Sequence, residues 1–171
     1  MSNSESQYSV RNEYNSYFED LNDAKLKSYI NERILGQIDW YDRKSIYNQK
    51  IYKRSMIISI ILSALIPIVT IFADFPITLL SKIIIASLSS CVTVISAVNA
   101  LCKYRDLWIQ YRTNCEILKS VLHRYFTRSG EFGGQTEVAS NLLLVDVCEN
   151  YLSKEFQAWS TIIPQHQDRH L

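Results

Sequence analysis

The sequence has almost no net charge, because its 18 lysines and arginines nearly balance its 17 aspartates and glutamates. A formal charge of +1 provides no general attraction to nucleic acid, so no nucleic-acid partner is expected. The four cysteines lie far apart without a CxxC pair, which predicts neither a disulfide framework nor a zinc site. Nucleophile-elbow, HExxH and P-loop motifs are also missing. We therefore expect no enzyme, no catalytic residue, no cofactor and no bound metal.

Long uncharged stretches are concentrated in the middle of the chain. Met56–Ala73 has 18 residues and Ile83–Cys102 has 20 residues without a charge. About 20 such residues cross a hydrocarbon core of about 30 Å. Pro67 predicts a kink in the first stretch, and residues 74–76 (Asp-Phe-Pro) predict a tight turn after it. We predict an all-α membrane hairpin with spans at about 56–74 and 78–102; a soluble protein with a buried hairpin is the alternative.

Basic residues lie mainly outside the two spans. Lys82 is the one basic residue between them, whereas basic residues cluster before the first span and after the second: Arg43, Lys44, Lys50, Lys53, Arg54, Lys103, Arg105, Arg112 and Lys119. Membrane proteins keep such residues on the cytoplasmic side. The pattern predicts a multi-pass membrane protein with both termini in the cytoplasm.

The flanks carry apolar residues at helical spacing. A heptad stripe without glycine or proline follows the second span, so span and stripe predict one helix from about Ile77 to Phe126; its members are Tyr104, Trp108, Tyr111, Cys115, Leu118, Leu122 and Tyr125. A glycine-rich segment, 127–136, ends this helix. Two further stripes predict helices over about 25–55 and 138–163. The first stripe begins with Leu26, Ile30, Ile34, Ile38 and Tyr41, and the second begins with Val138 and Leu142.

Three amphipathic helices can bury their apolar faces only against one another or against other copies. We therefore predict a single domain over 25–163, in which cytoplasmic helices at about 25–55, 103–126 and 138–163 form a bundle. Homo-oligomers are expected because short-looped hairpins gain packing by association in the membrane. Residues 1–24 are polar and predict a disordered segment, either a free tail or one that orders on binding, and 164–171 a second tail.

Several motifs in the chain resemble the SLATT group of two-transmembrane effector domains. They are WYDRKSIYNQKIYKR at 40–54, SALIP at 63–67, WIQYRTNCEILKSVLHRYFTRSGEF at 108–132 and KEFQAW at 154–159. The resemblance implies a bacterial inner-membrane protein that forms pores or disrupts membranes in a conflict system, activated by a nucleotide-signalling partner protein. The residues that carry it, with structural roles, are Trp40, Tyr41, Pro67, Trp108, Tyr111, Arg112, Glu116, Lys119, Glu155 and Trp159.

Small and polar residues follow one face of the second span. The candidates for a function are Lys82, Ser89, Thr93 and Ser96, with Asn99 beside the stripe. They either line a water-filled path between copies or let helices approach closely. Arg112 has two alternatives, an exposed pair with Glu116 or a bridge to Glu149 or Glu155 on the last helix. Trp40, Trp108 and Trp159 are expected to anchor the bundle rather than bind a ligand.

The function expected from these features is opening of the bilayer, not chemistry. We predict a homo-oligomeric effector that a partner signal switches from a closed to an open assembly. The alternative is a membrane-anchored scaffold whose cytoplasmic helices bind a partner protein.

Overall fold

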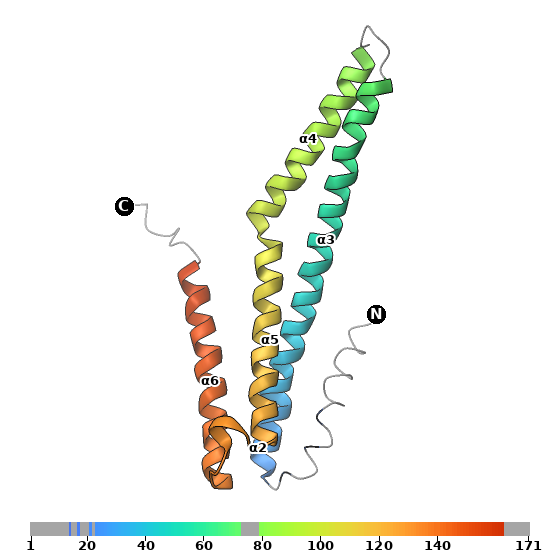
Figure 1. The fold of residues 1–171 in the computed structure, drawn as a ribbon. Coiled ribbons are helices and arrows are strands. Elements are labelled where there is room, and N and C mark those ends of the chain that lie inside the picture. Colours follow the sequence, from blue (N-terminus) through green and yellow to red (C-terminus); the bar gives the residue numbers. More distant parts are fainter. Residues whose placement is uncertain (1–13, 15–16, 18–20, 22, 73–78, 163–171) are drawn as a thin grey trace, which may run out of the picture. The chain divides into compact units, whose positions relative to one another are not determined.

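The computed structural model describes residues 14, 17, 21, 23–72 and 79–162, with side chains for all except 72, 155, 156 and 158–162. Every element within these residues is helical, which confirms the all-α class (Figure 1). The elements are α2 (Ala24–Ser28), η1 (Tyr29–Ile34), α3 (Leu35–Phe72), α4 (Leu79–Cys102), α5 (Tyr104–Phe126), η2 (Gly130–Phe132) and α6 (Glu137–Ile162). The turn predicted at 74–76, the tail 164–171 and most of segment 1–24 lie outside the described residues.

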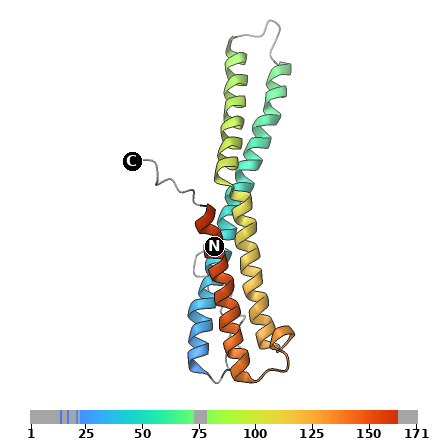
Figure 2. The ribbon, with the colours of Figure 1, turned by 90° about the vertical axis from the view of Figure 1, so that its left-hand side faces the viewer.

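The chain divides into two compact units. Unit 1 consists of residues 1–39 and 114–171, and unit 2 of Trp40–Thr113. In unit 1, η1 and the start of α3 lie beside the end of α5 and beside α6 (Figure 2). The core of unit 1 is built from the predicted stripes, because Leu26, Ile30, Ile34 and Ile38 are at most 5% exposed.

The stripe in η1 explains why this segment is a π-helix. Its apolar residues recur at intervals of four, Leu26, Ile30, Ile34 and Ile38. At 3.6 residues per turn, each such step would rotate the side chain by about 40°, so three steps would rotate the stripe by about 120°. The wider turn of a π-helix, with i to i+5 hydrogen bonds, reduces this rotation. All four side chains therefore stay in the core.

The end of α5 and the following loop also belong to unit 1. Cys115, Leu118 and Leu122 of the predicted heptad stripe are fully buried. The helix ends in a Schellman arrangement, in which Ser129 N–H donates to Arg124 O at 3.0 Å and Arg128 N–H donates to Tyr125 O at 3.2 Å. Helix α6 then packs through residues that include Leu144 and Cys148.

The predicted start of the α6 stripe was wrong. Val138 and Leu142 are 70% and 68% exposed, whereas Ser140 and Leu144 are buried. The buried face is therefore rotated away from the predicted one in the first turns of the helix.

Unit 2 contains the rest of α3, all of α4 and the start of α5. Helix α3 continues through Pro67 to Phe72 without ending at the proline. The helix predicted over 77–126 is interrupted, because α4 ends at Cys102 and α5 begins at Tyr104. Lys103, between them, has a φ of 48°, in the left-handed region.

Candidate functional site

The predicted polar stripe of α4 lies on the exposed side of the helix. Lys82, Ser89, Thr93 and Ser96 are all exposed within the single chain. The less exposed face of α4 is a different set of residues at alternating steps of three and four: Ile85, Leu88, Val92, Ile95 and Asn99. The matching face of α3 consists of Ser55, Ser59, Leu62, Ile66 and Val69. The hairpin thus packs through an apolar seam and leaves the stripe available for other contacts.

Two hydroxyl groups of this stripe bond to their own helix. Ser89 Oγ donates to Ile85 O at 2.9 Å, and Thr93 Oγ1 donates to Ser89 O at 2.9 Å. Such i to i−4 bonds supply a partner to a hydroxyl without any water or neighbouring chain. These two side chains are therefore compatible with lipid, with a second helix or with an aqueous path.

Asn99 separates from the stripe and belongs to the seam. Ser55 Oγ lies 2.9 Å from Asn99 Oδ1 and also 2.9 Å from the carbonyl oxygen of Tyr52. The amide of Asn99 therefore joins α4 to α3 at the end of the apolar seam. Asn99 thus lies apart from the exposed residues of the stripe, on the side of α4 that meets α3.

Arg112 has a partner on α3 that the sequence interpretation did not include. Its Nη1 donates to Asp42 Oδ1 at 3.0 Å, and the Asp42 side chain is only 15% exposed. The sequence interpretation missed this pair because Asp42 lies 70 residues away and belongs to no periodic pattern. Glu155 is on α6, but its side chain is outside the described residues.

Three aromatic rings lie close to this ion pair. Trp40 meets Tyr111 edge to face with ring centroids 5.5 Å apart, and Tyr41 lies 6.2 Å from Tyr111. Burial raises the pKa of the Tyr111 phenol, so the ring stays neutral. Lys44 Nζ lies 5.8 Å above the Trp40 ring. These contacts join the beginning of unit 2 in α3 to its end in α5.

A second polar group joins η1 to α6 in unit 1. Glu149 accepts hydrogen bonds from Tyr29 Oη at 2.9 Å and from Arg33 Nε and Nη2, both at 3.1 Å. The hydrogen bond from Arg33 and that from Tyr29 lower the pKa of Glu149, while burial and the neighbouring carboxylate raise the pKa of Tyr29. The sequence interpretation missed this group because it assumed an α-helix in this segment. In a π-helix, different residues face α6.

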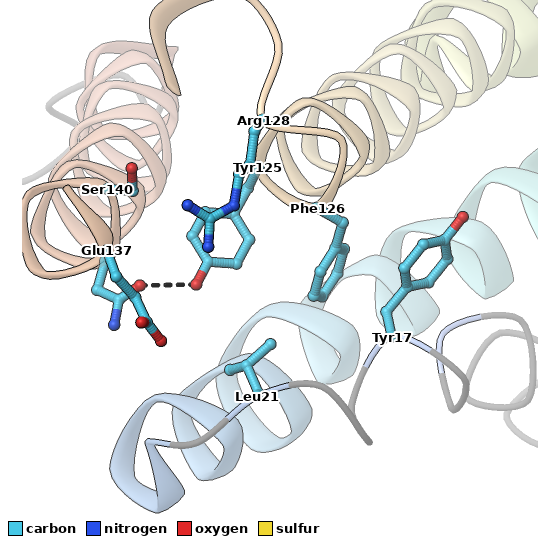
Figure 3. Close-up of a pocket in the computed structure, with 8 residues that line it drawn as sticks. Tyr17, Leu21, Tyr125, Phe126, Arg128, Glu137 and Ser140 are labelled. Atoms are coloured by element: carbon cyan, nitrogen blue, oxygen red, sulfur yellow. Dashed lines mark hydrogen bonds between the residues drawn. The ribbon is translucent and has the colours of Figure 1, made fainter. Parts of the chain in front are cut away.

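Unit 1 also contains a pocket of about 210 Å³ (Figure 3). Its wall includes two aromatic rings that lie far apart in the sequence, Tyr17 and Phe126. These rings stack with centroids 4.9 Å apart. Tyr125 Oη donates to Asn141 Oδ1 at 2.7 Å, so two of the polar groups in the wall already bind each other. Small-molecule sites usually measure about 300–1,000 Å³. The volume is below that range.

The remaining candidate residues are spread over three helices. Pro67 is inside α3, Trp108 and Lys119 are partly exposed on α5, and Glu116 is exposed on α5. Trp159 is on α6, with its side chain outside the described residues. Among the residues that the structure describes, no group of three or more His, Cys, Asp or Glu side chains could hold a metal ion.

Two helical segments are long and apolar enough to cross a membrane. They contain α3 and α4, and in both the most apolar stretch has no buried residue. The core helix of a soluble protein would be mostly buried in its own fold. The structure therefore agrees with the coarse prediction of two candidate spans.

Comparison with protein families adds one finding to this geometry. A family model described as "Protein of unknown function (DUF4231)" matches residues 36–139, which is more than half of the chain. The chain belongs to the DUF4231 family. The DUF4231 match includes both candidate spans, Lys103 and the Arg112–Asp42 pair, but not Tyr29, Arg33 or Glu149. No curated protein and no solved structure matches this DUF4231 chain.

Proposed function

We propose that this DUF4231 chain is a two-span membrane protein whose copies assemble and open a path for ions through the bilayer. Its flanking helices hold the assembly closed until a partner acts on them. The resemblance of residues 108–119 to the SLATT group supports a nucleotide-signalling protein as that partner in a bacterial conflict system.

Exposed apolar side chains support membrane insertion. Ile57, Ile58, Ile60 and Ile61 of α3 are 50–62% exposed, and Ile83 and Val94 of α4 are 54% and 58% exposed. Their placement around both helices would leave a large apolar surface in water. In lipid, the same surface is fully compatible with its surroundings.

The distribution of basic residues supports one orientation. Lys53, Arg54 and Lys103 lie at the ends of the spans that adjoin the flanking helices, and Lys82 lies at the opposite end of α4. Basic residues near membrane spans favour the cytoplasmic side. We propose that the flanking helices and both termini are cytoplasmic.

The outward position of the α4 stripe carries the proposal. The hairpin packs through its apolar seam, so Ser89, Thr93 and Ser96 remain exposed and can face other copies. In an assembly around a central axis, these hydroxyl groups would replace part of the hydration shell of a passing ion.

A matched pair of double variants tests this role. Thr93→Leu with Ser96→Leu removes two hydroxyls from the stripe, and Val94→Leu with Val98→Leu makes the same kind of change at exposed apolar positions. We expect the first pair to abolish dye leakage from vesicles and the second to leave it unchanged, with chemical crosslinking showing assembly in both. Leakage that persists in an assembled Thr93/Ser96 variant would exclude the stripe as the path.

One observation favours the alternative, a membrane-anchored scaffold. The Ser89 and Thr93 hydroxyls are bonded to their own helix, so the stripe does not require water. A scaffold should tolerate replacement of residues 83–102 by an unrelated apolar helix, with partner binding retained. A pore should lose its conductance under the same replacement.

A further inference from the structure

Lys103 adopts a backbone conformation that a lysine rarely has. Its φ of 48° places it in the left-handed region, where the Cβ of an L-residue lies too close to the next carbonyl oxygen. Residues in this region usually end a helix, as Arg128 does with a φ of 48° after α5. Lys103 differs from Arg128 because the chain re-enters a long helix at the next residue.

The left-handed conformation at this junction is confined to one residue. Lys103 N–H still donates to Asn99 O at 3.1 Å, and Lys103 O still accepts from Leu107 N–H at 3.0 Å. Neither glycine nor proline occurs between Leu79 and Phe126. A right-handed Lys103 would therefore turn α4 and α5 into the continuous helix that the sequence pattern predicts, and would pair N–H groups at the start of α5.

Contacts with α3 hold the bend from both sides. Ser55 on α3 meets Asn99 one turn before Lys103, and Asp42 on α3 binds Arg112 at 3.0 Å beyond it. Trp40 adds its edge-to-face contact with Tyr111 on the α5 side. Helix α3 is uninterrupted between these positions. The bend at Lys103 therefore lets both α4 and α5 contact the same helix, α3 (Figure 1).

We propose that Lys103 is a two-state hinge within unit 2. In one state it is left-handed and both contacts with α3 are made. In the other it is right-handed, α4 and α5 form one helix, and the contact on one side of the hinge is broken. The hinge couples any movement of α5 along α3 to the direction of α4. It goes beyond the proposed function, because it applies to a pore and to a scaffold alike.

The hinge can be tested by substitutions that favour each state. Lys103→Gly removes the steric conflict of the left-handed state, whereas Lys103→Val adds a branched side chain that this state excludes. A steric difference of this size corresponds to about a 5- to 30-fold change in the ratio of the two states. Lys53→Gly and Lys53→Val, at an exposed position of α3, are the matched controls.

Distances between spin labels at Val94→Cys and Thr113→Cys report the state, since both positions are exposed and lie on opposite sides of the hinge. The full-length protein would be measured in phosphatidylethanolamine and phosphatidylglycerol vesicles, with Cys91 and Cys102 replaced by alanine. Nineteen residues of straight helix span about 28 Å, and the bent state is shorter.

We expect the straight-helix distance to gain population in Lys103→Val and to disappear in Lys103→Gly, with no change in the Lys53 controls. Ser55→Ala, which leaves Lys103 intact and removes a contact of the bent state, should also favour the straight helix. One unchanged distance in the wild type, both Lys103 variants and Ser55→Ala would overturn the hinge. The spin-label experiment measures a distance and not conductance. Its outcome is therefore independent of whether the pore test succeeds or fails.

Discussion

Phe132 shows at the scale of one residue how a glycine-rich loop is held in place. It is 1% exposed in η2, and its ring meets Tyr125 edge to face with centroids 5.6 Å apart. Glycines at 130, 133 and 134 surround it in the sequence, so sequence patterning predicts only a loop here. The structure makes this side chain part of the core of unit 1.

Phe132→Ala should destabilise unit 1 through loss of apolar burial and through the cavity that remains. We expect a cost of about 3–5 kcal/mol, or a melting temperature lower by roughly 6 °C or more. Circular dichroism of the full chain in detergent measures this. Leu142→Ala is the control, because Leu142 is 68% exposed and its truncation should cost less than about 0.5 kcal/mol. Equal effects of the two substitutions would mean that Phe132 is not buried in the folded protein.

At the scale of elements, the contact between η1 and α6 depends on the charge of one carboxylate. Hydrogen bonds from Arg33 and Tyr29 lower the pKa of Glu149 relative to the unfolded chain. A carboxylate with a lowered pKa contributes stability above its unfolded pKa of about 4.3, and this contribution is lost as the pH falls through its folded pKa. The Arg33 and Glu149 side chains are 54% and 41% exposed, so solvent screening limits the effect.

We expect the wild type at pH 7 to melt up to about 2–4 °C above Glu149→Gln, equivalent to about 1 kcal/mol or less. This advantage should shrink as the pH falls below the unfolded pKa of about 4.3, and it is lost once the pH is below the lowered pKa of the folded carboxyl. Asp146→Asn, at an exposed carboxylate of the same helix, should produce a smaller difference. A wild-type advantage that stays constant from pH 7 down to the most acidic melt would contradict a role of the charge. Thermal melts over this pH range make the comparison.

Helical elements were predictable where apolar spacing repeats over many residues. The stripes of 26–41 and 104–125 led to buried residues such as Ile30 and Leu118. The π-helix was not predictable, because the four-residue spacing of its apolar stripe also suits an α-helix until the buried neighbours are known. The Lys103 break was not predictable, because it depends on how the helix fits its neighbours and not on its own residues. For the same reason the sequence offered glutamates as partners of Arg112 and did not include Asp42. For α4, the sequence identified the stripe, and the structure showed that it faces away from α3.

At the scale of the whole molecule, introducing a charged residue distinguishes a membrane span from a helix exposed to water. Ile60 on α3 and Ile109 on α5 are 62% and 45% exposed. Ile60→Arg should cost about 2.5–3.5 kcal/mol if this part of α3 crosses the bilayer, whereas Ile109→Arg should cost little in water. We expect the Ile60 variant to be depleted from the alkaline-washed membrane fraction and the Ile109 variant to remain there. Equal amounts of both in that fraction would argue against insertion of α3.

Hydroxyl groups within the two candidate spans bear on how copies would gather in the bilayer. Ser63, Thr70, Ser89 and Thr93 each donate to a carbonyl oxygen four residues earlier, at 2.8–2.9 Å. Because these four groups already have partners, they contribute little drive toward a neighbouring chain. Association would then follow mass action among weakly attracted hairpins. The abundance of the protein per unit of membrane area would set a steep threshold for assembly, and a cell could control it through synthesis and turnover alone.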